Sequence, residues 1–223
     1  MNWKKNYRSF YYKYADDPED IRLIANETAH LVIDVQKTYL KPKDNEKENK
    51  EWEPFYLRMK ETVIPNIRKL IDYNRQRNIE NIFARIACLK NDGSDRSLSQ
   101  KKPGFNYLLM PKNTDESQIV SELKPLEDDI VVLKTTDSAL TGSNLRLILN
   151  NMGIKNVICS GIFTDQCVSS TVRSLADESF NVVVIEDCCA AATKELHDHE
   201  LEIINMIYCN VIQLNDLKSM IAN

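Results

Sequence analysis

Several features are missing from this chain of 223 residues, and each absence narrows its class. No apolar run approaches the roughly 20 residues that a membrane-spanning helix requires, and no apolar segment typical of a signal peptide follows the first residues. The formal net charge is only −4, so no excess of either sign points to nucleic acid or a membrane surface as a partner. We therefore expect a cytoplasmic protein that binds neither.

Cysteine spacing excludes a second group of proteins. The chain has six cysteines but no CxxC pair, and most of them lie in apolar, strand-like runs. This usage is typical of reduced, buried thiols and argues against both a disulfide framework and a thiolate zinc site. The six are Cys88, Cys159, Cys167, Cys188, Cys189 and Cys209.

Short apolar strand patterns alternate with helical patterns along most of the chain. The strand candidates are rich in Val and Ile and apolar on both faces, as parallel strands covered by helices should be. This alternation predicts an α/β protein with a doubly wound, six-stranded parallel sheet and helices on both faces. The expected strands are Ala29–Val35, Asn81–Ala87, Asp129–Lys134, Asn156–Ile162, Asn181–Asp187 and Asn210–Leu214, and the expected helices are 54–77, 115–123, 141–152, 165–179, 194–207 and 216–221.

The domain organisation follows from the same pattern. Residues 21–223 are expected to form a single catalytic domain, and residues 1–20 an N-terminal arm rich in aromatic side chains. The arm suits either the surface of its own domain or a contact between subunits, where aromatic residues are enriched. Two segments are predicted to be loops: the charged stretch 41–53, expected to be solvated, and the long stretch 90–113.

Three chemically useful residues follow three of the predicted strands. Asp34 ends the first strand pattern, Lys134 ends the third, and Cys167 follows the fourth at the start of a helix. Parallel strands present their carboxyl ends at one edge of a sheet, where ligands bind, so these side chains can converge. The helix start is also expected to stabilise a Cys167 thiolate.

Each of these residues has an ordinary structural interpretation when taken alone. An Asp at a strand end forms turns, a Lys there is usually solvated, and a Cys in an apolar sequence is usually a small core residue. Together they have the composition of a nucleophilic site: a carboxylate to accept the thiol proton, and an ammonium to stabilise the negative charge. Backbone N–H groups at a helix start are natural oxyanion donors.

Three sequence motifs in this order resemble the isochorismatase-like cysteine hydrolases. The resemblance covers roughly residues 28–215, and Glu186-Asp187-Cys188-Cys189-Ala190-Ala191 is a weaker fourth motif. The three stronger motifs are Thr28-Ala29-His30-Leu31-Val32-Ile33-Asp34-Val35-Gln36, then Val131-Val132-Leu133-Lys134 followed by Ser138-Ala139-Leu140, and Gly161-Ile162-Phe163-Thr164-Asp165-Gln166-Cys167-Val168.

The resemblance implies a function and a set of roles. It implies a catalytic triad of Asp34, Lys134 and Cys167 that hydrolyses a small amide through a thioester. It also implies a cis peptide bond between Ile162 and Phe163, with the N–H groups of Phe163 and Cys167 forming the oxyanion hole. The substrate would be a small ureido or carbamoyl amide, and the enzyme would be a homodimer or homotetramer.

The chain departs from two branches of that superfamily. Nicotinamidases hold a metal with an Asp and a pair of His after the first strand, whereas no His lies between Gln36 and the second strand here. We therefore expect no metal and no other cofactor, and nicotinamide becomes a weaker candidate substrate. Isochorismatases proper generally lack the cysteine. A nicotinamidase-type or other amidase, and a catalytically silent interaction protein with the same fold, remain the alternatives.

Several other residues are candidates for substrate contacts. Gln36 either donates to a substrate carbonyl or binds loop backbone, and Arg96 in the long loop could bind an acidic group of a substrate. Asp165 is expected to cap the nucleophile helix, and His197 and His199 to be solvated or capping residues. The substrate-binding set is Gln36, Tyr39, Arg96, Ile162 and Phe163.

Overall fold

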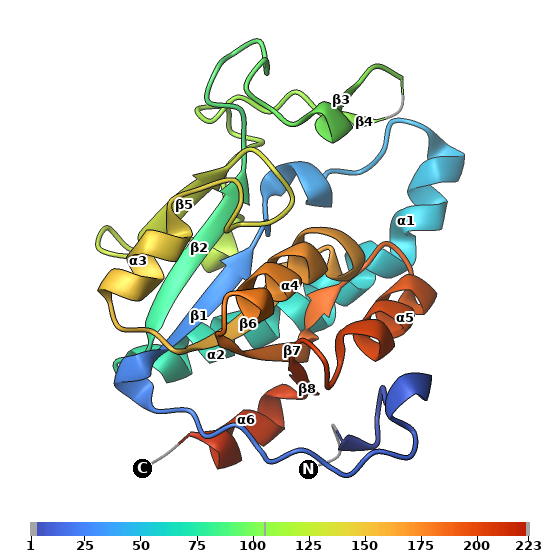
Figure 1. Cartoon of the computed structure of the whole chain (residues 1–223). Helices are drawn as coiled ribbons and strands as arrows, with labels where there is room; N and C mark the ends of the chain where they lie inside the picture. The colour runs from blue at the N-terminus through green and yellow to red at the C-terminus, as the bar shows by residue number, and fades with distance from the viewer. Residues whose placement is uncertain (1–3, 105, 222–223) are drawn as a thin grey trace.

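The computed structural model describes residues 4–104 and 106–221, and Figure 1 shows an α/β fold built on one central sheet. The predicted architecture is confirmed: six strands pair in parallel in the order β5-β2-β1-β6-β7-β8. The strands are β1 (Thr28–Ile33), β2 (Glu80–Ile86), β5 (Ile130–Lys134), β6 (Asn156–Ile162), β7 (Asn181–Ala190) and β8 (Asn210–Ile212).

Helices cover both faces of the sheet, and each face has its own apolar core. Every residue of β1 and β6 is buried, as expected for strands enclosed on both sides. One core packs the sheet against α3 (Leu145–Asn151), α4 (Ser169–Asp177) and α5 (Lys194–Ile204). The other packs it against α1 (Glu46–Arg58), α2 (Ile64–Arg75) and α6 (Leu214–Met220).

The charged segment 41–53 is not a loop throughout, contrary to the prediction. Helix α1 begins at Glu46 and continues through the π-helical segment η5 (Met59–Val63) into α2. Asn45 caps the helix by accepting the Glu48 N–H at 3.0 Å, and two glutamates in the first turn suit the positive end of its dipole. The charges had suggested solvent on all sides, but Trp52 packs on Phe55 and Phe163.

Two predicted helices are shorter than expected. In the segment 115–123 only Ser121–Leu123 is helical, as a 3-10 turn. Gln36 and Arg85 both donate to the Ser117 carbonyl, which holds that part of the chain in an irregular path. The helix expected over 141–152 begins only at Leu145, and residues 135–144 form a loop instead.

The long segment 90–113 extends beyond the carboxyl ends of the strands (Figure 1). It carries a 3-10 turn, Leu98–Gln100, and the two-residue strands β3 (Lys101–Lys102) and β4 (Asn106–Tyr107), which pair antiparallel. The segment is therefore ordered over its described residues and lies at the edge where the predicted site was placed.

The described part of the N-terminal arm, from residue 4, runs along the opposite side of the domain, and Trp3 lies outside the described residues. The amide of Asn205 donates to the backbone carbonyls of Asn6 and Tyr7, and Tyr7 packs against the core. Among the described helices, none has the length and apolar character needed to span a bilayer.

Candidate active site

Asp34 and Lys134 form a buried ion pair at the carboxyl edge of the sheet. Asp34 follows β1 and Lys134 ends β5, with β2 between these strands. The Lys134 Nζ lies 2.6 Å from Asp34 Oδ2, and the two residues are 0 % and 1 % exposed. Asp34 has φ of +53°, in the left-handed region that residues other than glycine adopt only uncommonly.

Backbone groups hold both charges in place. Asp34 Oδ1 accepts the N–H of Ile86 at 2.8 Å, and Lys134 Nζ donates to the Thr136 carbonyl at 3.0 Å. Asp34 Oδ2 makes the ionic contact with Lys134 but accepts no well-directed hydrogen bond. One carboxylate oxygen is thus anchored, while the other retains a lone pair with which to accept a proton.

Burial sets the proton affinities of the pair. It raises the pKa of Asp34 above its usual value of 3.8, although the positive charge of Lys134 opposes this. Burial alone would lower the pKa of Lys134, but the Asp34 charge outweighs it and the ammonium pKa is raised. Asp34 is therefore a stronger base than an exposed aspartate, and Lys134 stays charged.

Cys167 lies beside this pair on a tight connection between β6 and the next helix. Gly161 has φ of +118°, the peptide bond between Ile162 and Phe163 is cis, and the π-helical segment η8 (Thr164–Val168) leads directly into α4. A Cβ on Gly161 would lie 2.0 Å from the Ile33 carbonyl oxygen, so only glycine allows the chain to approach β1 here. β1 and β6 are neighbours, which brings Cys167 next to Asp34.

The Cys167 thiol is protonated in the free site. Burial, reinforced by the negative charge of Asp34, raises its pKa well above 9, and the opposing charge of Lys134 does not compensate. The expected stabilisation of a thiolate by the helix start is therefore wrong for the unliganded state. A thiol that lies against a carboxylate can instead transfer its proton during attack.

Asp137 also lies at the thiol, and the sequence motifs did not single it out. Its Oδ1 is 3.7 Å from Cys167 Sγ and accepts the Gln100 amide at 2.7 Å. Gln100 in turn accepts from Arg96 Nη2 at 3.3 Å. Asp137 follows Lys134 by three residues, immediately after a strand, and this position was the available signal. The structure thus connects the long loop to the nucleophile.

Two predicted substrate contacts, Tyr39 and Phe163, form an aromatic wall at the site. Their rings meet edge to face with centroids 5.4 Å apart, and Phe163 also contacts Phe55 at 5.2 Å. Burial raises the pKa of the Tyr39 phenol well above 10, and the charges of Asp34, Cys167, Asp137 and Arg96 also act on it. The five groups are therefore close enough to share one electrostatic environment.

Three other predicted residues differ in their surroundings. Both amide hydrogens of Gln36 go to the backbone carbonyls of Ile86 and Ser117, so it binds loop backbone, the second of its two predicted roles. The Ile162 side chain is fully buried in the apolar core and presents no surface to a substrate. Asp165 makes no capping hydrogen bond, and its Oδ1 is buried without a partner.

His197 is buried, contrary to the expectation of a solvated residue. Arg58 Nη2 lies 3.1 Å from its Nε2, and its Nδ1 lies 2.7 Å from the Thr164 hydroxyl. Since arginine can only donate, Nε2 accepts and Nδ1 carries the hydrogen. Burial, with the nearby Arg58 charge, lowers the pKa of His197 to about 3. The imidazole that contacts Thr164, in the segment carrying Cys167, is therefore neutral.

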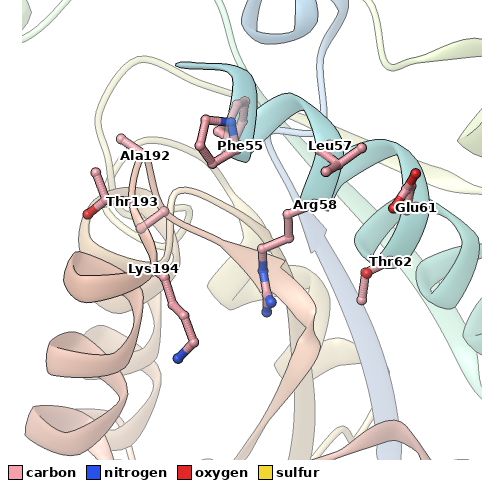
Figure 2. A pocket seen from close by; sticks show the side chains of 10 residues that line it. Phe55, Leu57, Arg58, Glu61, Thr62, Ala192, Thr193 and Lys194 are labelled. Atoms are coloured by element: carbon pink, nitrogen blue, oxygen red, sulfur yellow. The ribbon is translucent and has the colours of Figure 1, made fainter. Parts of the chain in front are cut away.

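A separate cavity of about 340 Å³ lies between α1 and the start of α5. Figure 2 shows Arg58 extending from α1 toward it, near Lys194 of α5. Its lining includes Phe55 and Ala191 but none of the three predicted catalytic residues. The convergence of Asp34, Lys134 and Cys167 is the stronger indication of chemistry, because it joins a nucleophile, a base and a cation in a nearly closed space.

No group of three or more His, Cys, Asp or Glu side chains within residues 4–104 and 106–221 is arranged to hold a metal ion. Lys134 is the cation that interacts with the Cys167 thiol.

Comparisons with known proteins place the chain in a family. A model of the isochorismatase domain matches residues 28–216. The chain is 30% identical over 183 residues to a ureidoacrylate amidohydrolase, RutB, of Agrobacterium fabrum, covering 76% of this chain and 78% of that protein. It is 29% identical over 174 residues to an Arabidopsis thaliana protein named a probable inactive nicotinamidase, covering 76% of this chain and 84% of that protein.

Solved structures share the fold. A cysteine hydrolase from Pseudomonas syringae matches with a TM-score of 0.75 at 18% identity, covering 92% of this chain and 98% of that one. An N-carbamoylsarcosine amidase from Thermoplasma acidophilum matches with a TM-score of 0.65 at 19% identity, covering 85% and 97%.

The chain belongs to the isochorismatase family and is a hydrolase. Within that superfamily it falls in the amidohydrolase branch, among hydrolases that act on carbon–nitrogen bonds other than peptide bonds.

Proposed function

We propose that this hydrolase cleaves a carbon–nitrogen bond of a small ureido or carbamoyl amide with Cys167 as nucleophile. The observation that carries the proposal is the buried Asp34–Lys134 pair, 2.6 Å apart, in contact with the Cys167 thiol. Burying two charges costs desolvation free energy. Such pairs are concentrated at functional sites, so this one supports a catalytic role.

In the first half-reaction the Cys167 sulfur attacks the substrate carbonyl carbon while its proton passes to Asp34. The carbon–sulfur bond forms, the carbon–nitrogen bond breaks, and Asp34 returns the proton to the departing nitrogen, which leaves as ammonia or an amine. Lys134 stabilises the negative charge that develops when the thiol loses its proton.

In the second half-reaction water attacks the sulfur-bound acyl group, a thioester or, from a ureido substrate, its carbamoyl equivalent. Asp34 takes a proton from that water and passes it back to sulfur as the carbon–sulfur bond breaks. The N–H groups of Phe163 and Cys167 are proposed to bind the oxyanion in both steps.

The substrate class rests on the similarity to a ureidoacrylate amidohydrolase at 30% identity. A nicotinamidase-type activity is the second candidate, favoured by the relative that carries that name. The same relative is described as inactive, so a silent protein is a third candidate; an acid, a cation and a thiol in mutual contact argue against it.

The test is ammonia release from ureidoacrylate, biuret, N-carbamoyl amino acids, nicotinamide and simple amides, by wild type and by Cys167→Ser and Cys167→Ala. Cys88→Ser, which alters a buried cysteine two residues after the end of β2, is the matched control. We expect hydrolysis of a ureido or carbamoyl compound and a loss of roughly 10³-fold or more in both Cys167 variants only. Full activity in Cys167→Ala would disprove the mechanism, and release from nicotinamide alone would replace the substrate class.

We also propose that the enzyme works in the cytoplasm. All six cysteines are free and buried, which suits a reducing compartment. Fractionation of the native cells, followed by detection of the protein, tests this; recovery from a secreted or membrane fraction would contradict it.

A further inference from the structure

The Arg96 guanidinium has an unused, buried donor at the site. The residue is 7 % exposed, and its Nη1 makes no hydrogen bond, whereas Nη2 is held by Gln100 at 3.3 Å. A buried guanidinium nitrogen without a partner is costly, because its hydration is lost and not replaced. Such a donor suits an acceptor that arrives with a ligand.

The position of Arg96 connects this donor to the nucleophile. Gln100 links it to Asp137, whose Oδ1 is 3.7 Å from Cys167 Sγ. The charge of Arg96 also acts on Tyr39, on which Asp34 and Cys167 act as well. Arg96 is therefore connected to the thiol of Cys167 through Gln100 and Asp137 and lies near it.

We infer that Arg96 binds the carboxylate of the substrate, so that the preferred substrate is a ureido or carbamoyl acid and not a neutral amide such as biuret or nicotinamide. This inference rests on the proposed function. A guanidinium binds carboxylates with paired, charge-assisted hydrogen bonds, and here Gln100 leaves Nη1 available.

Asp137 completes the complementarity. It is acceptor-only when ionised, and a ureido group offers several N–H donors. A substrate with a carboxylate at one end and a ureido group at the other would place the anion at Arg96 and its N–H groups near Asp137. Asp137 would repel a substrate whose carboxylate sat beside the thiol, which favours a single orientation.

The test compares N-carbamoyl-β-alanine with its methyl ester, which keeps the ureido group and removes the charge, together with N-carbamoylglycine and ureidoacrylate as acids of other lengths. Ammonia release is measured for wild type, Arg96→Met, Arg96→Lys and the control Arg146→Met, whose arginine pairs with Glu178 on the surface. Circular dichroism confirms that each variant is folded.

We expect wild type to prefer an acid over the ester. In Arg96→Met, kcat/KM for that acid should fall by roughly 10²-fold or more, mostly through KM, while the rate with the ester changes only a few-fold. Arg96→Lys should retain part of the preference, and free guanidinium should partly restore Arg96→Met. If Arg96→Met does not fold, a reduced but not abolished acid preference in Arg96→Lys supports the inference, and an unchanged preference overturns it.

Equal loss on acid and ester, or no preference in wild type, would overturn the inference while leaving the proposed function standing. Absence of ammonia from every ureido and carbamoyl compound would instead remove the proposed function itself.

Discussion

At the scale of single residues, the Asp34–Lys134 pair combines a high desolvation cost with a proposed role in proton transfer. Its two charges are almost fully removed from solvent, and each is kept in place by a backbone partner. The loss of either partner leaves the other charge buried alone, so stability and activity should respond differently to substitution.

Lys134→Met should lower the free energy of unfolding by about 3–5 kcal/mol, because it leaves the buried Asp34 carboxylate without a compensating charge. Asp34→Asn together with Lys134→Met removes both charges and should recover much of that loss, while activity stays absent because the base is gone. Urea unfolding and ammonia release measured on the single and double variants check this. Strictly additive losses of stability would contradict the ion pair.

Activity should depend on pH through Asp34 and Cys167. Asp34 must be ionised to accept the thiol proton, and burial raises its pKa, so the acid limb of kcat/KM should be centred above pH 3.8. The Cys167 pKa lies well above 9, so no decline from thiol ionisation is expected at neutral pH. Steady-state rates from pH 4 to 10, with circular dichroism at each pH, provide the measurement; an acid limb below pH 3.8 would contradict the assignment.

The same raised pKa predicts that Cys167 is a slow thiol in the unliganded enzyme, although we propose it as the nucleophile. Selective fast labelling by iodoacetamide is therefore not the right sign of function here, because the alkylating reagent reacts with thiolate. The sequence interpretation had considered the helix start and missed the opposing effects of burial and of the adjacent carboxylate.

At the scale of structural elements, the connection between β6 and α4 depends on one glycine. Gly161 follows the register shift of β6 against β7 and passes close to Ile33 of β1. Because β1 carries Asp34 and β6 carries the nucleophile connection, this close approach sets the distance between the base and the thiol.

Gly161→Ala should therefore be severely destabilising, or should abolish activity if the strands separate to accept the methyl group. Gly153→Ala is the matched control: it also has positive φ, +70°, but no atom lies within 4 Å of its added Cβ. We expect a cost of about 1 kcal/mol for the control, from its backbone conformation alone. Thermal unfolding of both variants decides the matter, and equal costs would mean that the contact with Ile33 is unimportant.

A buried polar network joins three neighbouring strands of the sheet. His30 of β1 contacts Asn81 of β2 at 3.0 Å and Ser160 of β6 at 2.8 Å. Burial lowers the pKa of His30 to about 4, so the histidine is neutral in the folded protein at physiological pH.

At the scale of the whole molecule, this network should make the fold sensitive to acid. Between pH 6.5 and about 4 the unfolded chain binds a proton at His30 that the folded chain does not. Stability is thus fully present above pH 6.5 and falls by up to about 3 kcal/mol as the pH drops to 4. Urea unfolding at pH 7.0, 5.5 and 4.5 should show a smaller decline in His30→Gln; an unchanged decline would exclude His30 as a source.

The N-terminal arm is proposed to join copies of this chain into a homodimer or homotetramer. Phe10, Tyr11 and Tyr14 are 80 %, 87 % and 90 % exposed, although the preceding Tyr7 is packed against the core. Aromatic side chains of this kind are enriched at interfaces. Replacing all three with serine should lower the mass measured by light scattering without changing the unfolding temperature, whereas a wild-type monomer would refute the proposal.

The sequence was sufficient for the sheet and for the three residues that we propose to be catalytic, because both have local signatures. Runs of Val and Ile bounded by turn residues identified the six strands of the sheet, and the polar residue after each strand indicated which edge carries the chemistry. Asp34, Lys134 and Cys167 were therefore found without any knowledge of their contacts. The charged start of α1 was missed because Trp52 alone among its first residues shows that this helix packs against the domain.

The tertiary structure decided the rest, because those properties depend on burial and on partners distant in the chain. Burial, not the helix start, sets the Cys167 pKa; Gln36 binds backbone 50 residues away; and Asp137, Gln100 and Arg96 converge from two separate loops. Desolvation and hydrogen bonding act through space and leave no periodic trace in sequence. The sequence alone thus determined which groups are available for catalysis, and folding determined their protonation states and the unpaired Arg96 donor that we assign to the substrate.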